Sequence, residues 1–269
     1  MLIAQLSDPH IFERGELMEG RVDTARNLSL ALSTLKALST QPAAILLTGD
    51  LVNDGTPDQY EHLREVLADD LGSLIVVAGN HDDRAGMRKL FPQLSGCGSG
   101  NDSIDYVIDI DEGDFAMTFV VLDTTVPGEH GGSLGVDQLS WLESQLETRQ
   151  DRRVVVVQHH PPFASGIRFM DEYGLRGAAA EAEVLRRFVN IDAVLCGHLH
   201  RPASSSFGGT IAFASPSTAA QVSPSFAGET TSYTEESGMF SLHWWTASGL
   251  VTHLHPVGRC GQWVPAWAR

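Results

Sequence analysis

The segment LIVVAGNHDD (residues 74–83) carries five apolar residues into a glycine and then ends on an amide, an imidazole and two carboxylates. A Gly-Asn pair is typical of a tight turn, because these residues tolerate the backbone angles that a reversal of the chain requires. Four consecutive polar groups at the end of a buried segment are also typical of a binding site. The rest of the chain has to distinguish the two interpretations.

Short apolar runs with polar ends recur along the chain and predict the strands of the fold. They are rich in Val, Ile and Leu and too short for free-standing helices, which is typical of strands buried on both faces. Besides residues 74–82, the runs are LIAQLSDPH (2–10), AAILLTGD (43–50), FVVLDTT (119–125), RVVVVQHHPP (153–162) and DAVLCGHLH (192–200).

Helical patterns lie between these runs. Apolar residues at helical spacing predict helices within residues 23–39, 56–71 and 135–149, and Thr56 before Pro57 is typical of a helix N-terminus. This alternation of strands and helices predicts an α/β fold with the helices outside the sheets.

The chain after about residue 200 is rich in Ser, Thr and Gly, with short alternating runs. We expect antiparallel strands and loops here that complete a second sheet and border the substrate. Since no internal repeat or long low-complexity segment divides the chain, residues 1–269 are expected to form a single domain.

Composition and charge limit the possible partners. The 269 residues include 18 Lys and Arg against 34 Asp and Glu, a formal net charge of −16. Binding a nucleic-acid backbone generally requires a basic surface that releases counterions, and the sequence has no basic cluster. Small molecules are therefore the expected substrates. No apolar run approaches the ~20 residues that a membrane span requires.

The three cysteines, Cys97, Cys196 and Cys260, are far apart and form no CxxC pair. This pattern argues against a disulfide framework and a thiolate zinc site, and it favours a reducing compartment. The start of the sequence shows neither the basic segment nor the cleavage pattern of a secretory signal. We therefore expect a cytoplasmic protein.

Potential metal ligands collect at the ends of the predicted strands, where α/β folds place their binding sites. Each alone has an ordinary explanation, since an Asp after a strand is most often a cap and alternating histidines can mark an edge strand. Five such blocks in one chain exceed what capping explains. The blocks are Asp8 with His10, Asp50, Asn80 with His81 and Asp82, His159 with His160, and His198 with His200.

The residue types in these blocks suit divalent cations. Carboxylate, imidazole and amide groups are ligands of Mn, Fe, Zn or Co. The spacing in Asp8-x-His10 and in His198-x-His200 places both side chains on one side of an extended segment. About seven candidate ligands are too many for one tetrahedral ion, but they match two ions that share a carboxylate, an arrangement that stabilises phosphoryl displacement.

Taken together, the blocks resemble the complete signature of the calcineurin-like metallophosphoesterases: Asp8-x-His10, Gly49-Asp50, Gly79-Asn80-His81-Asp82, His159-His160-Pro161 and Gly197-His198-Leu199-His200. They span about three quarters of the chain. The resemblance implies a four-layer αββα sandwich with a dinuclear metal site at the carboxyl ends of the central strands. It is closest to the small bacterial class III cyclic-nucleotide phosphodiesterases and glycerophosphodiesterases.

The family pattern also implies the ligands of two divalent ions. One ion would be held by Asp8, His10, Asp50 and His200. The other would be held by Asp50, Asn80, His159 and His198, so that Asp50 bridges the two.

Side chains beside these ligands are expected to act on the substrate. His81, next to the ligand Asn80, would contact the phosphate or protonate the leaving alkoxide, a role worth about 10²–10⁴ in rate. Asp82 would orient His81, as a carboxylate behind an imidazole commonly does. His160 is either a pocket residue that contacts the substrate, as Asn80 and His81 would, or a packed strand residue.

The expected function is hydrolysis of small phosphodiesters, either cyclic nucleotides or glycerophosphodiesters, by hydroxide that the metals generate. A phosphomonoesterase or nucleotide pyrophosphatase on the same core is the alternative. A metal-binding interaction module without catalysis is a third interpretation, which the complete ligand set disfavours. A homo-oligomer that uses the polar C-terminal strands is compatible with the sequence.

Several other residues receive weaker interpretations. Within residues 163–175, a candidate lid, the side chains available to touch a ligand are Arg168, Met170, Asp171 and Tyr173. An ordinary loop that packs into the core is the competing interpretation of this segment. His62 and His130 have no partner in the pattern and are expected at the surface, and Asp123 is expected only to cap a strand.

Overall fold

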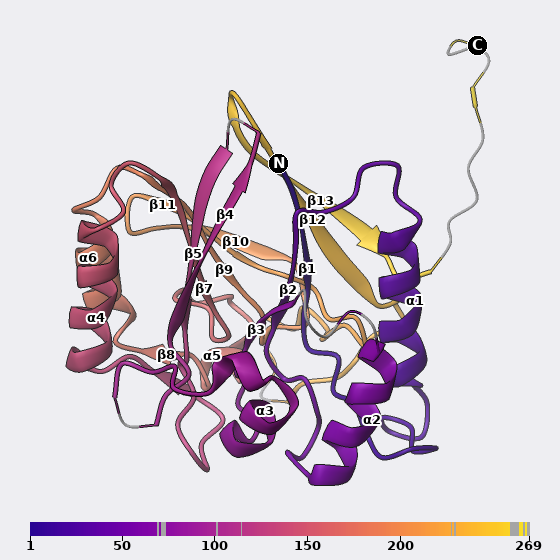
Figure 1. Ribbon diagram of the computed structural model, residues 1–269. Coiled ribbons are helices and arrows are strands. Elements are labelled where there is room, and N and C mark those ends of the chain that lie inside the picture. The colour runs from indigo at the N-terminus through magenta and orange to yellow at the C-terminus, as the bar shows by residue number, and fades with distance from the viewer. Residues whose placement is uncertain are drawn as a thin grey trace.

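A computed structural model describes residues 1–68, 70, 74–100, 102–113, 115–226, 228, 230–258, 264, 265 and 267. Two sheets pack face to face, and helices cover the outer side of each, which gives four layers (Figure 1). The expected α/β architecture, the four-layer αββα sandwich, is therefore confirmed.

The first sheet has the strand order β13-β12-β1-β2-β3. Strands β1, β2 and β3 run parallel, whereas β12 and β13 are antiparallel to their neighbours. The strands are β1 (Leu2–Leu6), β2 (Ala44–Thr48), β3 (Leu74–Val77), β12 (Met239–Thr246) and β13 (Gly249–Pro256).

The second sheet has the strand order β10-β11-β9-β7-β5-β4. Its four central strands are parallel, and the outer strands β10 and β4 are antiparallel to their neighbours. The strands are β4 (Tyr106–Glu112), β5 (Phe115–Leu122), β7 (Arg153–Gln158), β9 (Ile191–Cys196), β10 (Ala203–Phe207) and β11 (Thr210–Ala214).

Helices α1, α2 and α3 cover the first sheet, and α4 and α6 cover the second (Figure 1). Their bounds are α1 (Thr24–Lys36), α2 (Pro57–Leu67), α3 (Arg84–Leu90), α4 (Val136–Glu147) and α6 (Ala178–Leu185). The short elements are α5 (Arg168–Asp171), a 3-10 turn (Pro92–Leu94) and the parallel pair β6 (Gly132–Ser133) and β8 (Leu175–Arg176).

Side-chain oxygens satisfy the first free N–H groups of three helices. The expected cap Thr56 accepts from the backbone N–H of Gln59, at 3.3 Å. Asp23 caps α1 in the same way, and Asp83, which received no role from the sequence, caps α3. Removal of such a cap typically costs about 1 kcal/mol.

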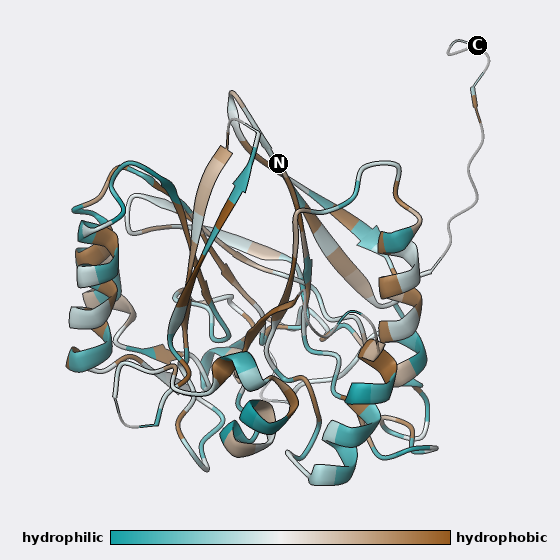
Figure 2. Ribbon diagram, viewed as in Figure 1, coloured by the Kyte–Doolittle hydropathy of each residue, from teal (hydrophilic) through white to brown (hydrophobic). Residues whose placement is uncertain are grey.

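Three hydrophobic layers hold the sandwich together. Leu46, Val155 and Trp245 belong to the layer between the two sheets, where all three are almost fully buried. Leu28 of α1 packs with the outer side of the first sheet, and Leu142 of α4 with that of the second. In Figure 2 the hydrophobic residues concentrate on the central strands and on the inner sides of the helices.

The C-terminal part of the chain differs from the expectation that it completes one sheet. Strands β10 and β11 extend the second sheet, but β12 and β13 return to the first sheet and pair beside β1. β12 covers the edge of β1 that β2 leaves unpaired, which protects an otherwise exposed strand edge. The C-terminal segment therefore joins both sheets.

Two further findings concern properties expected from composition. No helix in the described ranges is both long and apolar enough to span a bilayer. Cys97 and Cys196 are free thiols, and Cys260 lies outside the described residues.

Candidate active site

The loops that follow β1, β2, β3, β7 and β9 converge at the carboxyl ends of these strands and bring the predicted ligands together. Four of them form one buried cluster, in which one potential ligand atom from each residue lies within 4.8 Å of all the others. These four residues are Asp8, His10, Asp50 and His200, the set expected for the first ion.

Distances within this first cluster suit a metal ion. Nε2 of His10 lies 3.0 Å from Nε2 of His200 and 3.5 Å from Oδ2 of Asp50. Nε2 of His200 lies 3.6 Å from Oδ1 of Asp8. Two nitrogens that each bind an ion at about 2.1 Å and at right angles would be about 3.0 Å apart, so the cluster fits a divalent cation without rearrangement.

The second expected set meets the first at Oδ2 of Asp50, the oxygen that both His10 and His159 face. Nε2 of His159 is 3.3 Å from Oδ2 of Asp50 and 3.2 Å from Oδ1 of Asn80. Nε2 of His198 is buried and has no hydrogen-bond partner within the described part of the chain. An unpartnered buried nitrogen is costly, and a metal ion would satisfy it. The Asp50 carboxylate thus lies where the two sets meet.

Backbone carbonyls fix the ring orientation of two ligands. Nδ1 of His159 lies 2.9 Å from the carbonyl oxygen of Thr48, and Nδ1 of His200 lies 3.0 Å from that of Ala220. A carbonyl oxygen can only accept, so each Nδ1 carries a hydrogen and each Nε2 is the nitrogen that faces the cluster. This is the usual arrangement behind a metal-binding histidine.

The backbone at the ligands is strained. Five of the seven expected ligands adopt a positive φ, which is uncommon for residues other than glycine. They are Asp8 (49°), His10 (43°), Asp50 (50°), His198 (68°) and His200 (51°). Such strain persists only where the surrounding structure enforces it, and it concentrates at functional sites.

Glycines allow the ligand loops to approach one another. A Cβ atom on Gly79 would lie 2.1 Å from the backbone nitrogen of Asp50. A Cβ atom on Gly197 would lie 2.1 Å from Oγ of Ser7. Both glycines belong to the recognised motifs, and their role is to let three loops meet at one point.

The protonation states of the cluster favour binding of a cation. Burial lowers the pKa of His10 and of His198 well below the usual range, so both rings are neutral and can bind metal. Burial opposes ionisation of Asp50, but the adjacent His159 and His10 hold the pKa of Asp50 well below its usual range. Burial also opposes the charged form of His159. The negative charge of Asp50 outweighs this effect and raises the pKa of His159. A bound cation would replace the proton on His159.

His81 lies where the sequence predicted it, beside the ligands. Its ring centroid is 4.7 Å from that of His10, and its backbone N–H donates to Oδ1 of Asp50 at 2.9 Å. Nδ1 of His81 lies 2.6 Å from the carbonyl oxygen of Asn53. Because this carbonyl accepts from Nδ1–H, Nε2 is the nitrogen that can act on a ligand.

Asp82 does not orient His81, so this expectation is wrong. Its carboxylate accepts from the backbone N–H groups of Gly79 (2.9 Å) and Leu51 (3.1 Å) and from the Tyr60 hydroxyl (3.3 Å). Burial and the nearby Asp50 raise the pKa of Asp82 to about 7. Asp82 joins the loops after β2 and β3, and the carbonyl of Asn53 orients His81 instead.

His160 is packed among buried side chains, the second of the two interpretations that the sequence left open, and one of its ring nitrogens lies within 4.8 Å of those of His159 and His198. Nδ1 of His160 lies 2.8 Å from Oγ1 of Thr124, and Nε2 lies 3.0 Å from the carbonyl oxygen of His130. Burial lowers the pKa of His160 to about 3, so the ring stays neutral. It donates from Nε2 to the His130 carbonyl and accepts from the Thr124 hydroxyl, so both ring nitrogens are hydrogen-bonded.

A cavity of about 250 Å³ opens over the ligands. Two side chains of the candidate lid, Met170 and Tyr173, line it, whereas Asp171 instead accepts from the N–H groups of Ser165 and Gly166. Arg168 does not line the cavity and pairs with Glu172 on the surface.

Several lining residues escaped the sequence analysis. His130 was expected only at the surface; it is exposed but faces the cavity. Phe169 and Tyr233 also line it. These three residues lie in loops or in short elements without a periodic pattern, so no signal in the sequence distinguished them. His62 is half-buried, with Nδ1 2.7 Å from the carbonyl oxygen of Phe12.

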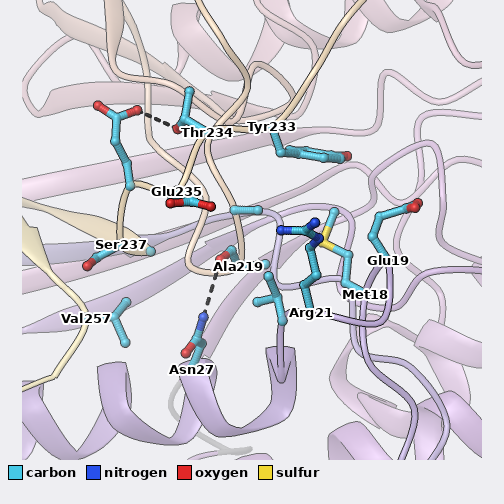
Figure 3. Close-up of a pocket in the computed structure, with 14 residues that line it drawn as sticks. Met18, Glu19, Arg21, Asn27, Ala219, Tyr233, Thr234, Glu235, Ser237 and Val257 are labelled. Atoms are coloured by element: carbon cyan, nitrogen blue, oxygen red, sulfur yellow. Dashed lines mark hydrogen bonds between the residues drawn. The ribbon is translucent and has the colours of Figure 1, made fainter.

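A larger cavity, of about 630 Å³, adjoins the first. Met18 and Tyr233 line both cavities and mark the boundary between them. Figure 3 shows the larger cavity, with Arg21 and Asn27 directed into it and the Asn27 amide bonded to the carbonyl oxygen of Ala219.

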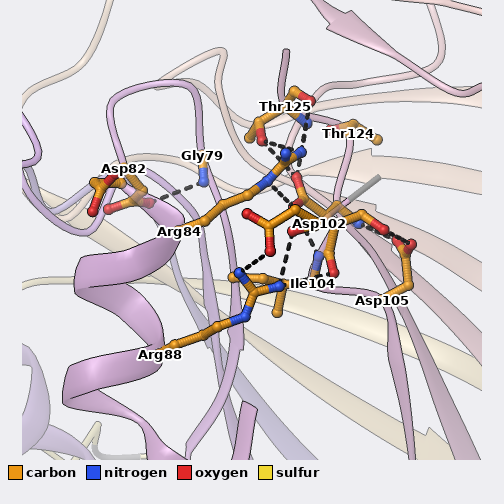
Figure 4. A network of polar contacts seen from close by, with 12 residues as sticks. Gly79, Asp82, Arg84, Arg88, Asp102, Ile104, Asp105, Thr124 and Thr125 are labelled. Atoms are coloured by element: carbon orange, nitrogen blue, oxygen red, sulfur yellow. Dashed lines mark hydrogen bonds and ion pairs between the residues drawn. The ribbon is translucent and has the colours of Figure 1, made fainter. Parts of the chain in front are cut away.

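A buried polar network supports the loop that carries His81. Arg84, at the start of α3, pairs with Asp123 at 2.7 Å and donates to the carbonyl oxygen of Thr125 (Figure 4). Asp105 accepts from the backbone N–H of Asp123 at 2.8 Å. Asp123 therefore does more than cap β5: it ties the second sheet to α3.

Comparisons with known proteins agree with this geometry. Residues 1–202 match the model of a family described as calcineurin-like phosphoesterase. The chain belongs to this family. The family predicted from the five sequence blocks is therefore confirmed, and with it a metal-dependent phosphoesterase core.

Curated relatives are similar to this chain over most of its length. A probable glycerophosphodiester phosphodiesterase, GpdQ, of Arcobacter nitrofigilis is 29% identical, with 96% of this chain and 94% of the relative covered. A probable cyclic nucleotide phosphodiesterase of Rhodopseudomonas palustris is 36% identical, with 78% of this chain and 75% of the relative covered.

Solved structures share the fold. The crystal structure of a dimetal phosphatase from Danio rerio matches with a TM-score of 0.63, over 96% of this chain and 99% of the other, at 16% sequence identity. At this identity the match shows the fold alone.

Proposed function

We propose that this family member is a two-metal hydrolase of small phosphodiesters, either cyclic nucleotides or glycerophosphodiesters. The observation that carries the proposal is the convergence of all seven expected ligands from five separate loops, with the Nε2 atoms of His10, His159 and His200 directed into the cluster. The curated relatives named above support the substrate class.

The proposed ligand assignment follows the two sets that the loops bring together. Asp8, His10, Asp50 and His200 would hold one ion, and Asp50, Asn80, His159 and His198 the other. Two divalent ions held here would lower the pKa of a water molecule and neutralise the charge of a phosphate group. The mixture of carboxylate, imidazole and amide oxygen suits Mn, Fe, Zn or Co.

His81 would protonate the alkoxide that leaves phosphorus. Its Nδ1–H is held by the Asn53 carbonyl, so the transferable proton sits on Nε2 when the ring is protonated. The backbone N–H of His81 donates to Asp50, which fixes the distance between the acid and the metal cluster. General acid catalysis of this kind contributes about 10²–10⁴ in rate.

The cavity favours diesters over the alternative substrates, phosphomonoesters and nucleotide pyrophosphates. No Lys or Arg occurs among the described residues that line it. A monoester carries up to two negative charges and a diester only one, so a site whose sole cations are its two metals is better matched to the diester. This observation supports phosphodiesterase over phosphomonoesterase activity.

Turnover of bis(p-nitrophenyl) phosphate by the Mn-loaded protein tests the proposal. We expect hydrolysis by the wild type, faster than that of p-nitrophenyl phosphate, and loss of most activity in Asn80→Ala. Gln150→Ala, which removes an exposed amide far from the cluster, serves as the matched control. Equal activity of wild type and Asn80→Ala would contradict the assignment. A homo-oligomer and a cytoplasmic location stay predictions.

A further inference from the structure

Three ring-bearing side chains, His130, Phe169 and Tyr173, form one side of the catalytic cavity and are called here the aromatic wall. His130 comes from the loop before β6, and the other two come from α5 and the turn that follows it. The metal chemistry described above uses none of the three.

The wall continues directly from the catalytic histidine. Ring centroids are 5.9 Å apart between His81 and His130, 5.5 Å between His130 and Tyr173, and 5.4 Å between Tyr173 and Phe169. The last two pairs are edge-to-face, a favourable arrangement for aromatic rings. A group bonded to a phosphate at His81 would therefore lie along this series of rings.

The wall is held in place from behind. The buried His160 donates to the carbonyl oxygen of His130, at 3.0 Å. The loop of His130 is joined to the turn after α5 by the β6–β8 pairing and by a 2.7 Å ion pair between Glu129 and Arg176. His160 thus acts as a positioning residue for the wall.

The polar atoms of the wall are available to a ligand. Among the described residues, neither ring nitrogen of His130 nor the hydroxyl of Tyr173 has a hydrogen-bond partner. A planar heterocycle offers a face for stacking and edge groups for hydrogen bonds, so it could use both properties of the wall. A glycerol or ethanolamine substituent has no aromatic face to stack.

We propose that the aromatic wall is a subsite for the planar base of a nucleoside substituent, and that it makes the enzyme selective for nucleoside diesters over glycerophosphodiesters. The inference rests on the proposed phosphodiesterase function. Stacking of a base on an aromatic side chain contributes about 1–3 kcal/mol, which corresponds to about 5- to 150-fold in kcat/KM.

The test compares kcat/KM for cyclic AMP and for glycerophosphoethanolamine in the Mn-loaded wild type and in three variants. Tyr173→Ala removes a ring of the wall, Tyr173→Phe keeps the ring, and Glu172→Ala changes an exposed neighbour outside the cavity. We expect Tyr173→Ala to lose about 5- to 150-fold with cyclic AMP and less than twofold with glycerophosphoethanolamine. Tyr173→Phe should retain most of the selectivity, and Glu172→Ala all of it.

Equal losses for both substrates in Tyr173→Ala, or an unchanged value for cyclic AMP, would overturn the inference. Calorimetric binding of AMP and of glycerol 3-phosphate provides a readout without turnover: the wild type should prefer AMP, and Tyr173→Ala should lose this preference. Circular dichroism checks that each variant is folded. A wild type that leaves bis(p-nitrophenyl) phosphate intact would instead contradict the proposed function itself.

Discussion

Nε2 of His10 and Nε2 of His200 lie 3.0 Å apart, although 190 residues separate them in the chain. Nδ1 of His200 donates to the Ala220 carbonyl, so Nε2 is the nitrogen of His200 that faces His10, and a cation between the two Nε2 atoms would bind both rings. The loops at the carboxyl ends of β1 and β9, which belong to different sheets, bring the two residues together. The relationship indicates a preformed metal site that folding assembles.

The first prediction concerns metal content. His200→Ala should reduce the Mn bound per chain from two ions to about one, because the first ion loses one of its two imidazole ligands. Atomic emission on protein equilibrated with Mn and then desalted measures the ratio. His253→Ala, which removes an exposed histidine from β13, should keep the wild-type content. Unchanged metal in His200→Ala would remove His200 from the ligand set.

The second prediction concerns metal removal. Chelation should abolish hydrolysis and lower the Tm, because an ion that binds the folded but not the unfolded state stabilises the fold, by an amount that grows with the logarithm of the free-ion concentration above its Kd. Added Mn should restore both properties. Differential scanning fluorimetry with and without Mn measures the shift in Tm. An identical Tm under both conditions would contradict Mn binding to the folded cluster.

The third prediction concerns His81 as the acid. His81→Gln should lower kcat by about 10²–10⁴ for a diester with an alkoxide leaving group, which needs protonation. The loss should be much smaller with bis(p-nitrophenyl) phosphate, because p-nitrophenolate leaves without a proton. Similar losses for both substrates would assign His81 to binding of the phosphate. Asp82→Asn should not reproduce this dependence on the leaving group, since Asp82 does not contact His81.

Much of this site was predictable from the sequence, because one general rule gives the position of binding sites in α/β folds. Polar residues that follow parallel strands meet at one edge of the sheets, so the order of residues alone is enough to group Asp8, Asp50 and His198. The partner of His81 was not predictable, because adjacency in the chain does not determine which acceptor a ring faces. Asp82 turns toward the backbone of Leu51 instead.

The remaining differences arise from long-range packing. The apolar runs identified β1 to β3, β5, β7 and β9, yet alternating polar segments after residue 200 did not reveal which sheet each strand would join. Tyr173 and His130 lie in turns whose positions depend on the β6–β8 pair, two residues on each side. So short a pairing leaves no periodic signal.

The fourth prediction concerns pH and the buried Glu181 of α6. Burial raises the pKa of Glu181 from its ordinary value of 4.5 to about 8, although the nearby Gln158 side chain acts in the opposite direction. The folded state therefore binds the proton more tightly than the unfolded state does. The stability that the neutral acid provides is complete below pH 4.5 and is lost as the pH rises through about 8.

Glu181→Gln should flatten this pH dependence of the free energy of unfolding. Above pH 8 the variant should be more stable than the wild type by a few kcal/mol, because each unit of pKa shift corresponds to about 1.4 kcal/mol. Urea denaturation at pH 6 and pH 9 measures the difference. Glu183→Gln, two residues along α6 with an exposed side chain, should behave as the wild type. Parallel profiles for wild type and Glu181→Gln would show that Glu181 does not titrate in this range.

The fifth prediction concerns the network in Figure 4. Asp123→Ala leaves the largely buried Arg84 without its carboxylate and should destabilise the protein by about 3–5 kcal/mol. Asp111→Ala breaks an ion pair of similar length with Arg152 in which Asp111 is mostly exposed, so the cost should stay below about 1 kcal/mol. Urea denaturation compares the two variants, and equal costs would contradict a structural role for Asp123.

The location of the metals tests the central claim most directly. Anomalous scattering from crystals grown with Mn should show two peaks on either side of the Asp50 carboxylate. One peak should lie among Asp8, His10 and His200, and the other among Asn80, His159 and His198. A single peak, or peaks away from these residues, would contradict the assignment of a dinuclear phosphodiesterase centre.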